Sequence, residues 1–213
     1  MSARWYDQDR EELPEIEFLK TVRVWEGARI FDLGAHQGVV ALRLARTLGS
    51  SGQVIAVESG RRNFELAMEN KRLNEAGNLT LLHAVVDAID GNSVLFSSEI
   101  NGSVSASGNP VASRSIDSLA LQYGVPDLVM LDIEGYECRA LAGAAETLET
   151  CANWCIEVHA GCGLESFGGS AEQVVQIFTD HGYSLHCYAE DEDKVHSLSF
   201  IPRGRFFLIA TRN

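Results

Sequence analysis

Apolar and polar positions alternate along the chain in a way that predicts strands and helices in turn. Short apolar runs, which are typical of buried strands, lie at residues 30–32, 54–57, 79–83, 93–96, 128–132, 154–158, 184–188 and 205–211. Helical patterns lie between them at residues 39–48, 61–75 and 136–148, and a capping box at Ser170 and Gln173 begins a helix that ends at Gly182. This alternation predicts an α/β fold with a mostly parallel sheet and helices on both faces. The last two strands are separated only by a polar loop, so they should be antiparallel neighbours.

The predicted sheet occupies one domain, residues 27–213, with no internal repeat. Before it, residues 1–26 form an N-terminal segment in which Leu13, Ile16, Leu19 and Val22 recur at spacings of three. That spacing predicts a short amphipathic helix over residues 9–22. The serine-rich segment 97–113 is expected to be a mobile lid or insertion.

Composition narrows the possible partners and location. The chain has 213 residues, 46% of them hydrophobic, which is enough for a single core. A formal net charge of -13 weighs against binding to nucleic acid or to an anionic membrane. The five cysteines are an odd set without a C-x-x-C pair, which favours reduced thiols over disulfides or thiolate-bound zinc. No run of eighteen apolar residues occurs, so we expect a cytoplasmic protein without a membrane partner.

The first strand leads into a loop with the character of a cofactor site. Asp32 is followed by Gly34, Ala35, His36 and Gly38, and glycines let backbone approach a ligand closely. The loop lacks the middle glycine of a dinucleotide fingerprint, which leaves less room for a pyrophosphate. An acid before the glycines suits a positively charged cofactor such as S-adenosylmethionine. The alternative is an ordinary strand-to-helix turn with a chance acid.

A second acid strengthens the cofactor interpretation. Glu58 ends the second strand, twenty-six residues after Asp32, where its carboxylate could accept hydrogen bonds from two ribose hydroxyls. The pair of acids on adjacent strands predicts a nucleotide-type cofactor site.

Ionisable residues also follow later strands. The carboxyl ends of parallel strands form the ligand crevice, so Asp132, Glu157 and His159 should lie on the same rim as the cofactor loop. Alternation puts Glu157 and His159 on one side of their strand, where Glu157 could orient the imidazole as a base or join it in holding a metal. Glu137 is interpreted as a helix N-terminal acid that satisfies the helix dipole.

Several of these residues belong to one longer motif. The run Asp132-Ile133-Glu134-Gly135-Tyr136-Glu137, with Leu141 and Gly143-Ala144 after it, resembles the FkbM-type S-adenosylmethionine-dependent methyltransferases. The resemblance covers roughly residues 12–211 and includes the 32–38 loop and Glu58. His36 departs from the asparagine common in the family, and Ser59-Gly60 replaces a proline and a polar residue.

The resemblance implies a fold, an activity and a set of contacts. It implies a single Rossmann-like class I methyltransferase domain, with a mostly parallel seven-stranded sheet and a C-terminal antiparallel hairpin. It also implies O-methylation of a hydroxyl on a sugar or natural-product small molecule. By resemblance, the loop glycines line the methionine part, Glu58 holds the ribose, and Val85, Val86 and Asp87 border the adenine. The positions expected to contact the cofactor are Asp32, Gly34, Ala35, His36, Gly38, Glu58, Ser59, Val85, Asp87 and Asp132.

The implied reaction is an in-line attack of a hydroxyl on the sulfonium methyl, which requires alignment and removal of a proton. Candidates for the acceptor side are Asp132, Glu134 and His159. A divalent metal held by Asp132, Glu157 and His159 could acidify the hydroxyl instead. We prefer the metal-free base, because imidazole is an uncommon ligand for magnesium.

Two other function classes remain as alternatives. An NAD-dependent oxidoreductase would share the logic of Glu58 but needs the glycine pattern that is missing here. A noncatalytic adenosine-cofactor-binding domain would keep Gly34 and Glu58 while losing the rim acids Asp132 and Glu134, which this chain retains.

Overall fold

A computed structural model describes residues 26–97, 103–104, 108–189 and 195–212. The helix predicted over residues 9–22 lies outside this part of the chain, so it stays a prediction. The elements, in chain order, are β1 (Arg29–Leu33), α2 (Val39–Leu48), β2 (Gln53–Glu58), α3 (Arg61–Leu73), β3 (Leu79–His83), β4 (Val85–Val86), β5 (Ser93–Ser97), β6 (Ser103–Val104), β7 (Asn109–Arg114), α4 (Ile116–Tyr123), β8 (Leu128–Leu131), α5 (Glu137–Leu141), α6 (Ala145–Thr150), β9 (Asn153–Val158), η1 (Leu164–Phe167), α7 (Ala171–Asp180), β10 (Ser184–Ala189), β11 (His196–Ser197) and β12 (Phe206–Thr211).

The main sheet is mostly parallel, as predicted. Its strand order is β11-β10-β12-β9-β8-β1-β2-β3, and the five strands from β9 to β3 run parallel. In the centre, Asp32 on β1 lies level with Ala56 on β2 and Met130 on β8. The antiparallel pairing of β10 with β12 confirms the predicted closing strands, and the short strand β11 adds an eighth strand at that edge.

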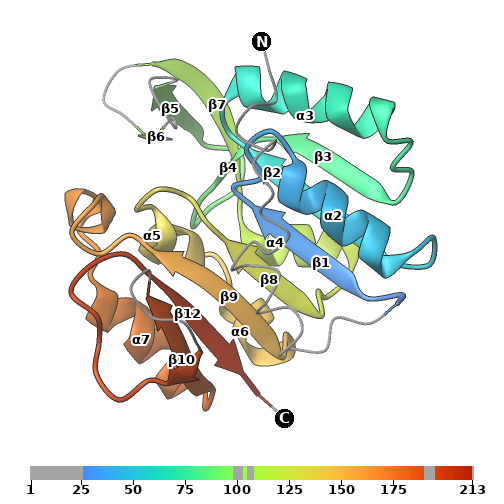
Figure 1. Cartoon of the computed structure of the whole chain (residues 1–213). Coiled ribbons are helices and arrows are strands. Elements are labelled where there is room, and N and C mark those ends of the chain that lie inside the picture. Colours follow the sequence, from blue (N-terminus) through green and yellow to red (C-terminus); the bar gives the residue numbers. More distant parts are fainter. Residues whose placement is uncertain (1–25, 98–102, 105–107, 190–194, 213) are drawn as a thin grey trace.

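Helices cover both faces of this sheet (Figure 1), with α2 and α3 on one face and α4 to α7 on the other. The arrangement follows from alternation along the buried strands, since successive side chains point to opposite faces. On β1, Phe31 and Leu33 join the apolar cluster that includes α4 to α7. Ile30 joins the second cluster with Leu44 and Leu48 of α2. A strand apolar at nearly every position is therefore buried on both sides.

Residues 85–114 form a second, smaller sheet, which differs from the expectation. Its order is β4-β7-β5-β6, so the strand predicted at 93–96 pairs with β7 and lies outside the main sheet. The serine-rich segment 97–113 is not simply a loop, because it contains β6 and most of β7. Val111 is buried against Val85 and Val94, which gives β7 an apolar side. Residues 98–102 and 105–107 of that segment lie outside the described part.

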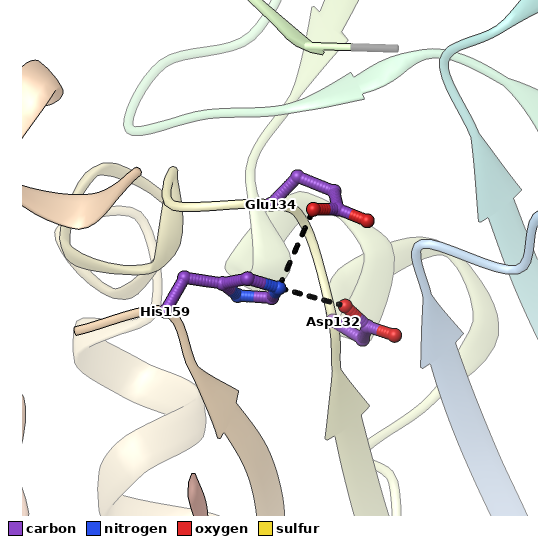
Figure 2. A group of neighbouring side chains, drawn as sticks. All are labelled: Asp132, Glu134 and His159. Carbon is purple, nitrogen blue, oxygen red and sulfur yellow. Dashed lines mark ion pairs between the residues drawn. The ribbon is translucent and has the colours of Figure 1, made fainter. Parts of the chain in front are cut away.

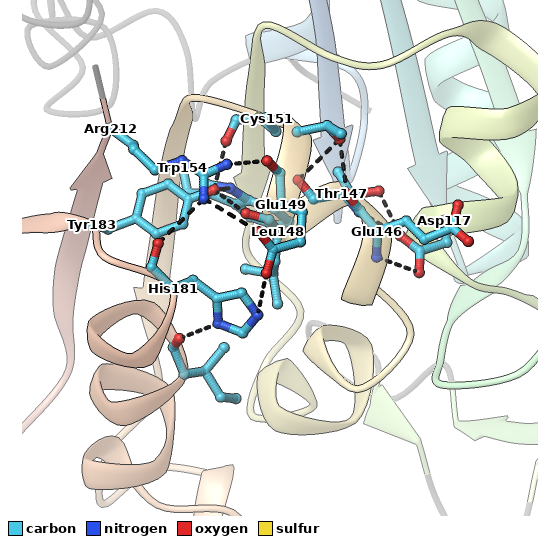
Figure 3. Close-up of polar contacts among 12 residues, drawn as sticks. Asp117, Glu146, Thr147, Leu148, Glu149, Cys151, Trp154, His181, Tyr183 and Arg212 are labelled. Carbon is cyan, nitrogen blue, oxygen red and sulfur yellow. Dashed lines mark hydrogen bonds and ion pairs between the residues drawn. The ribbon is translucent and has the colours of Figure 1, made fainter.

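The single helix expected over residues 136–148 is wrong, because the chain forms α5 and α6 with a break between them. At the break, a Cβ on Gly143 would lie 2.6 Å from the carbonyl oxygen of Asp87, so the chain passes very close to β4. The Gly143 carbonyl accepts a hydrogen bond from the Asp117 N–H (2.9 Å). The Asp117 carboxylate in turn accepts one from the Thr147 N–H (2.8 Å) and so caps α6 (Figure 3).

The amino end of β9 is fixed by a buried tyrosine (Figure 3). The Tyr183 hydroxyl donates to the Leu148 carbonyl (2.7 Å) and accepts from the Trp154 indole N–H (3.1 Å). The guanidinium of Arg212 lies 4.8 Å from the centre of the Tyr183 ring. These contacts join α6, β9 and the start of β10 at the end of the sheet opposite the predicted site.

No helix in the described ranges is both long and apolar enough to cross a membrane. The five cysteines all have free thiols.

The turn after β1 lies very close to the end of β8. Gly34 has φ 104°, and a Cβ at this position would lie 1.7 Å from the carbonyl oxygen of Asp132. A Cβ and a carbonyl oxygen cannot lie that close to each other, so only glycine allows the ends of β1 and β8 to meet as they do.

We predict that Gly34→Ala lowers the free energy of unfolding by at least about 3 kcal/mol, because the backbone has to move and the positive φ is strained. Thermal or urea unfolding measures the change. Gly77→Ala is the matched control, since nothing lies within 4 Å of its Cβ position. It should shift stability by no more than about 0.5 kcal/mol, and equal effects of the two variants would contradict the packing argument.

Candidate functional site

Residues at the carboxyl ends of the parallel strands form two adjacent groups. The first group lies around the glycine loop after β1, residues 34–38, which we call the cofactor loop after its predicted role. Glu58, the last residue of β2, is hydrogen-bonded to this loop. Asp132 follows β8 and His159 follows β9, and both lie in a second group that we call the rim cluster, defined as Asp132, Glu134 and His159. Because the Asp132 carbonyl lies against Gly34, the two groups are neighbours.

The Glu58 carboxylate is fixed to the cofactor loop by backbone donors. Its Oε2 accepts a hydrogen bond from the His36 N–H (2.8 Å), and its Oε1 accepts one from the Gly60 N–H (2.7 Å). Burial raises the pKa of Glu58 to about 7, although these backbone hydrogen bonds act in the opposite direction. Each carboxylate oxygen has about two lone pairs, so both oxygens keep acceptor capacity for ribose hydroxyls.

The rest of the cofactor loop is fixed by its neighbours. The N–H groups of Gly34 and Ala35 both donate to the Val57 carbonyl (2.9 and 3.0 Å). Gly38 has φ 77°, and a Cβ there would lie 3.1 Å from the Cβ of Ala67 on α3. The close neighbour of Gly38 is therefore α3. His36 itself adopts a left-handed backbone, with φ 50°.

The other predicted cofactor residues lie along the same edge. Asp32 is buried at the end of β1, and Val85 and Val86 are buried in β4. Asp87 is also buried, but its Oδ1 accepts hydrogen bonds from the Ala88 N–H (2.7 Å) and from Arg139 Nε (3.2 Å), and it forms an ion pair with Arg139 Nη2 (3.0 Å). The sequence did not indicate this pairing with Arg139. The Ser59 carbonyl oxygen lies 3.0 Å from His83 Nε2.

Figure 2 shows the rim cluster, in which the His159 imidazole points between two carboxylates. His159 Nε2 lies 3.7 Å from Asp132 Oδ1 and 3.5 Å from Glu134 Oε2. The His159 side chain is 3% exposed, whereas those of Asp132 and Glu134 are 52% and 39% exposed. The cluster therefore presents two accessible carboxylates backed by one buried imidazole.

The carboxylate that contacts His159 Nδ1 is Glu137, a partner that the sequence did not indicate. Glu137 Oε1 lies 2.8 Å from His159 Nδ1 and also accepts a hydrogen bond from the Gly135 N–H (2.9 Å). Glu137 is the first residue of α5, as predicted, and it is also fully buried. Glu157, which we expected to orient the imidazole, lies 3.1 Å from Arg205 Nε instead. The metal candidates are corrected as well, because the carboxylate grouped with Asp132 and His159 is Glu134 rather than Glu157.

An unusual turn positions Glu134. Glu134 and Gly135 both have positive φ angles, 54° and 98°, so the chain reverses just after β8 and brings the Glu134 side chain near His159. A Cβ on Gly135 would lie 2.5 Å from the carbonyl carbon of Gly163, so the loop after β9 packs tightly on this turn. A non-glycine residue in the left-handed region costs free energy, and such strain is common at functional sites.

The charges of the rim cluster affect one another. Burial alone would lower the pKa of His159, but the hydrogen bond and charge of Glu137, together with Asp132 and Glu157, raise it to about 9. Desolvation by the surrounding protein atoms and the charge of the neighbouring Glu157 raise the pKa of Asp132 well above its ordinary range. Such a group can accept a proton, donate hydrogen bonds to an oxygen, or hold a cation.

The sequence matches the model of the Methyltransferase FkbM domain over residues 32–185, which is more than half of the chain. The match includes the cofactor loop, Glu58 and the rim cluster. No curated protein sequence matches the chain significantly.

Solved structures with the same fold are distant in sequence. The methyltransferase FkbM from Methylobacillus flagellatus has a TM-score of 0.58 and 16% identity, over 88% of this chain and 44% of that protein. An S-adenosylmethionine-dependent O-methyltransferase from Thermotoga maritima has a TM-score of 0.57 and 14% identity, over 98% of this chain and 69% of that one. A putative rRNA-methylase from Clostridium thermocellum has a TM-score of 0.56 and 12% identity, over 93% of both chains. At these identities, the likeness shows a shared methyltransferase fold.

The raised pKa of Glu58 predicts a pH dependence of stability. Its value changes from 4.5 to about 7 on folding, so between these values the folded state keeps a proton that the unfolded state loses. This contribution to stability is complete below pH 4.5 and is lost as pH rises through 7. As the pH rises from 4.5 to above 7, the wild type should lose about 3 kcal/mol of unfolding free energy relative to the non-titrating variant Glu58→Gln, since one pKa unit corresponds to about 1.4 kcal/mol.

Urea unfolding of both proteins at several pH values between 4.5 and 8 measures this difference, and subtraction removes the titrations they share. Parallel pH curves for the two proteins would contradict the raised pKa.

Proposed function

The chain belongs to the FkbM family of S-adenosylmethionine-dependent methyltransferases, and from this premise we propose that it methylates a hydroxyl group of a small molecule such as a sugar or natural product. The observation that carries the proposal is the rim cluster beside the cofactor loop. A hydroxyl is a weak nucleophile that must lose its proton during transfer, so an O-methyltransferase benefits from a positioned proton acceptor.

The residues of the cofactor loop fit S-adenosylmethionine. Gly34 lets the end of β8 come close and Gly38 lets α3 pack close, so the loop is held at the strand ends where the cofactor is expected. Glu58 keeps acceptor capacity on both oxygens for the ribose hydroxyls. The buried Asp32 places a carboxyl group at the same edge, which suits the positive charges of the cofactor. When bound, the cofactor supplies an electrophilic methyl group on its sulfonium.

The rim cluster supplies what the acceptor needs. The backbone carbonyl of Asp132 lies against Gly34, so an acceptor held by the Asp132 side chain lies next to the cofactor loop. The Asp132 and Glu134 carboxylates are accessible enough to accept hydrogen bonds from hydroxyl groups. Alignment of this kind can supply several kcal/mol of the rate enhancement.

Aromatic side chains border this region and favour a ring-shaped acceptor. Tyr136 and Phe167 meet edge to face, with ring centres 5.1 Å apart, and both are partly exposed. Tyr136 lies next to Gly135 in the turn that carries Glu134. An aromatic wall beside hydrogen-bond acceptors suits a ring with both apolar and hydroxyl surfaces. The net charge of -13 argues in addition for a small molecule over RNA.

Incubation with methyl-labelled S-adenosylmethionine and a panel of sugars, phenols and polyketides tests the proposal. We expect label in a methyl ether, identified by the O-methyl signal in the NMR spectrum of the product. Transfer RNA and ribosomal RNA belong in the same panel. Label on RNA, or on nitrogen or carbon of a small molecule, would overturn the proposal.

We predict that Asp132→Asn and Glu58→Gln affect different parameters. Asp132→Asn should lower kcat by about 100-fold or more while leaving cofactor affinity within about threefold, because its side chain faces the acceptor. Glu58→Gln should weaken cofactor binding by about tenfold, as expected when an amide N–H₂ replaces one of two hydrogen-bond acceptor oxygens.

Isothermal calorimetry measures the cofactor affinity and steady-state kinetics measure kcat. The matched control is Glu172→Gln, an exposed acid on α7, which should change neither quantity. Weak cofactor binding by Asp132→Asn with normal kcat would reverse the assignment of the two sides.

A further inference from the structure

We propose that Asp132, Glu134 and His159 form a binding site for a divalent transition-metal ion on the acceptor side. Each of the three residues offers one ligand atom, and these atoms all lie within 4.8 Å of one another. They come from two strand ends and the turn between β8 and α5, so the main sheet holds them in place. The role of the ion in methyl transfer rests on the proposed function, whereas its binding does not.

The distances between the ligand atoms fit an ion better than direct hydrogen bonds. His159 Nε2 lies 3.5 Å from Glu134 and 3.7 Å from Asp132, whereas charge-assisted hydrogen bonds are about 2.7–2.9 Å long. Ligands about 2.0–2.2 Å from an ion, at angles between octahedral and tetrahedral, lie roughly 3 to 3.6 Å apart. A small closure of two half-exposed side chains would therefore complete the coordination.

Glu137 provides an independent observation that points to a metal. Its carboxylate lies 2.8 Å from His159 Nδ1, and this contact fixes the ring so that Nε2 faces Asp132 and Glu134 (Figure 2). Metal-binding histidines commonly donate their second ring N–H to a carboxylate, which sets the tautomer and makes the ligand nitrogen more basic. Here His159 is buried and held at Nδ1, with Nε2 directed into the cluster.

The charge around His159 also calls for a cation. The carboxylates of Asp132, Glu134 and Glu137 contact the imidazole, and Glu157 interacts with Asp132. Arg205 pairs with Glu157 and offsets one of these charges. Like charges at such a density repel one another, and a bound divalent ion would be the largest compensating charge at the rim.

The donor set indicates which ion would bind. Two carboxylates and an imidazole suit Mn²⁺, Fe²⁺ or Zn²⁺, whereas Mg²⁺ prefers oxygen ligands alone. The imidazole thus argues against magnesium without arguing against a metal, which revises the preference for a metal-free base. Three protein ligands leave coordination positions for an acceptor hydroxyl and water.

An ion in this place would lower the pKa of the bound hydroxyl. The acceptor O–H bond breaks and its proton passes to bulk water. The oxygen then bonds to the methyl carbon as the carbon–sulfur bond of S-adenosylmethionine breaks, and S-adenosylhomocysteine leaves with the electron pair.

Manganese binding to the metal-stripped full-length protein tests the inference without any acceptor. Calorimetry or electron paramagnetic resonance should show saturable Mn²⁺ binding by the wild type and by the control variant Glu172→Gln. Binding should weaken at least tenfold in His159→Ala and in Glu134→Gln. Glu137→Gln should weaken it about 10- to 100-fold, because it removes the charge behind the ligand.

Circular dichroism and cofactor binding establish that each variant remains folded. Absence of saturable Mn²⁺ binding up to about 1 mM by the folded wild type, a range that exceeds the affinities of most functional sites, would overturn the inference. Equal affinity of the wild type and His159→Ala would overturn it as well.

Turnover separates this inference from the proposed function. If a chelator abolishes methyl transfer to a hydroxyl and Mn²⁺ restores it, both are supported. If Mn²⁺ binds as expected but no hydroxyl is methylated, the metal site is supported and the proposed function is overturned. If hydroxyl methylation is unchanged in the presence of a chelator, the catalytic role of the metal is overturned and the proposed function is supported.

Discussion

The contact between Gly34 and the backbone of Asp132 is the constraint on which the site depends. A Cβ at Gly34 would lie 1.7 Å from the Asp132 carbonyl oxygen, so glycine alone lets the ends of β1 and β8 meet. The cofactor loop belongs to one strand end and the rim cluster to the other. Their closeness therefore follows from sheet geometry, and the distance between a bound cofactor and an acceptor is set by rigid strands rather than by mobile loops.

The second important contact is made by Glu137, whose buried carboxylate binds both the backbone of the turn after β8 and the imidazole of His159. Its carboxylate accepts a hydrogen bond from the Gly135 N–H and holds His159 Nδ1, so the turn after β8 and the imidazole after β9 are fixed by one buried group. Gly135 packs against Gly163, which brings the loop after β9 onto the same turn. Loss of the Glu137 carboxylate would remove the contact at Nδ1 that orients the His159 ring.

The sequence predicts those features that depend on periodicity and strand order. The bounds of α2 and β3, the parallel centre of the sheet and the antiparallel pair β10–β12 agree with the structure because buried strands and amphipathic helices carry a strong repeat. The break between α5 and α6 was missed, since it depends on Asp117 and Gly143, twenty-six residues apart. The contact of Glu137 with His159 cannot be predicted from the sequence for a similar reason. The position of Glu137 suits a helix N-terminus, and only the packing of β9 beside it reveals His159 as its partner.

The two acidic groups of the site differ in how their charge is tolerated. Glu58 is compensated by backbone donors, which are fixed parts of the fold, and burial raises its pKa to about 7. The carboxylates of Asp132 and Glu134 instead share one cationic partner, the imidazole of His159, which lies 3.7 Å and 3.5 Å from them. A fold that keeps repelling carboxylates at a strained turn gives up stability for them. A ligand that binds only the folded state stabilises that state by mass action and so offsets this loss. The rim cluster is therefore what we expect of a ligand-binding site rather than of a structural ion pair.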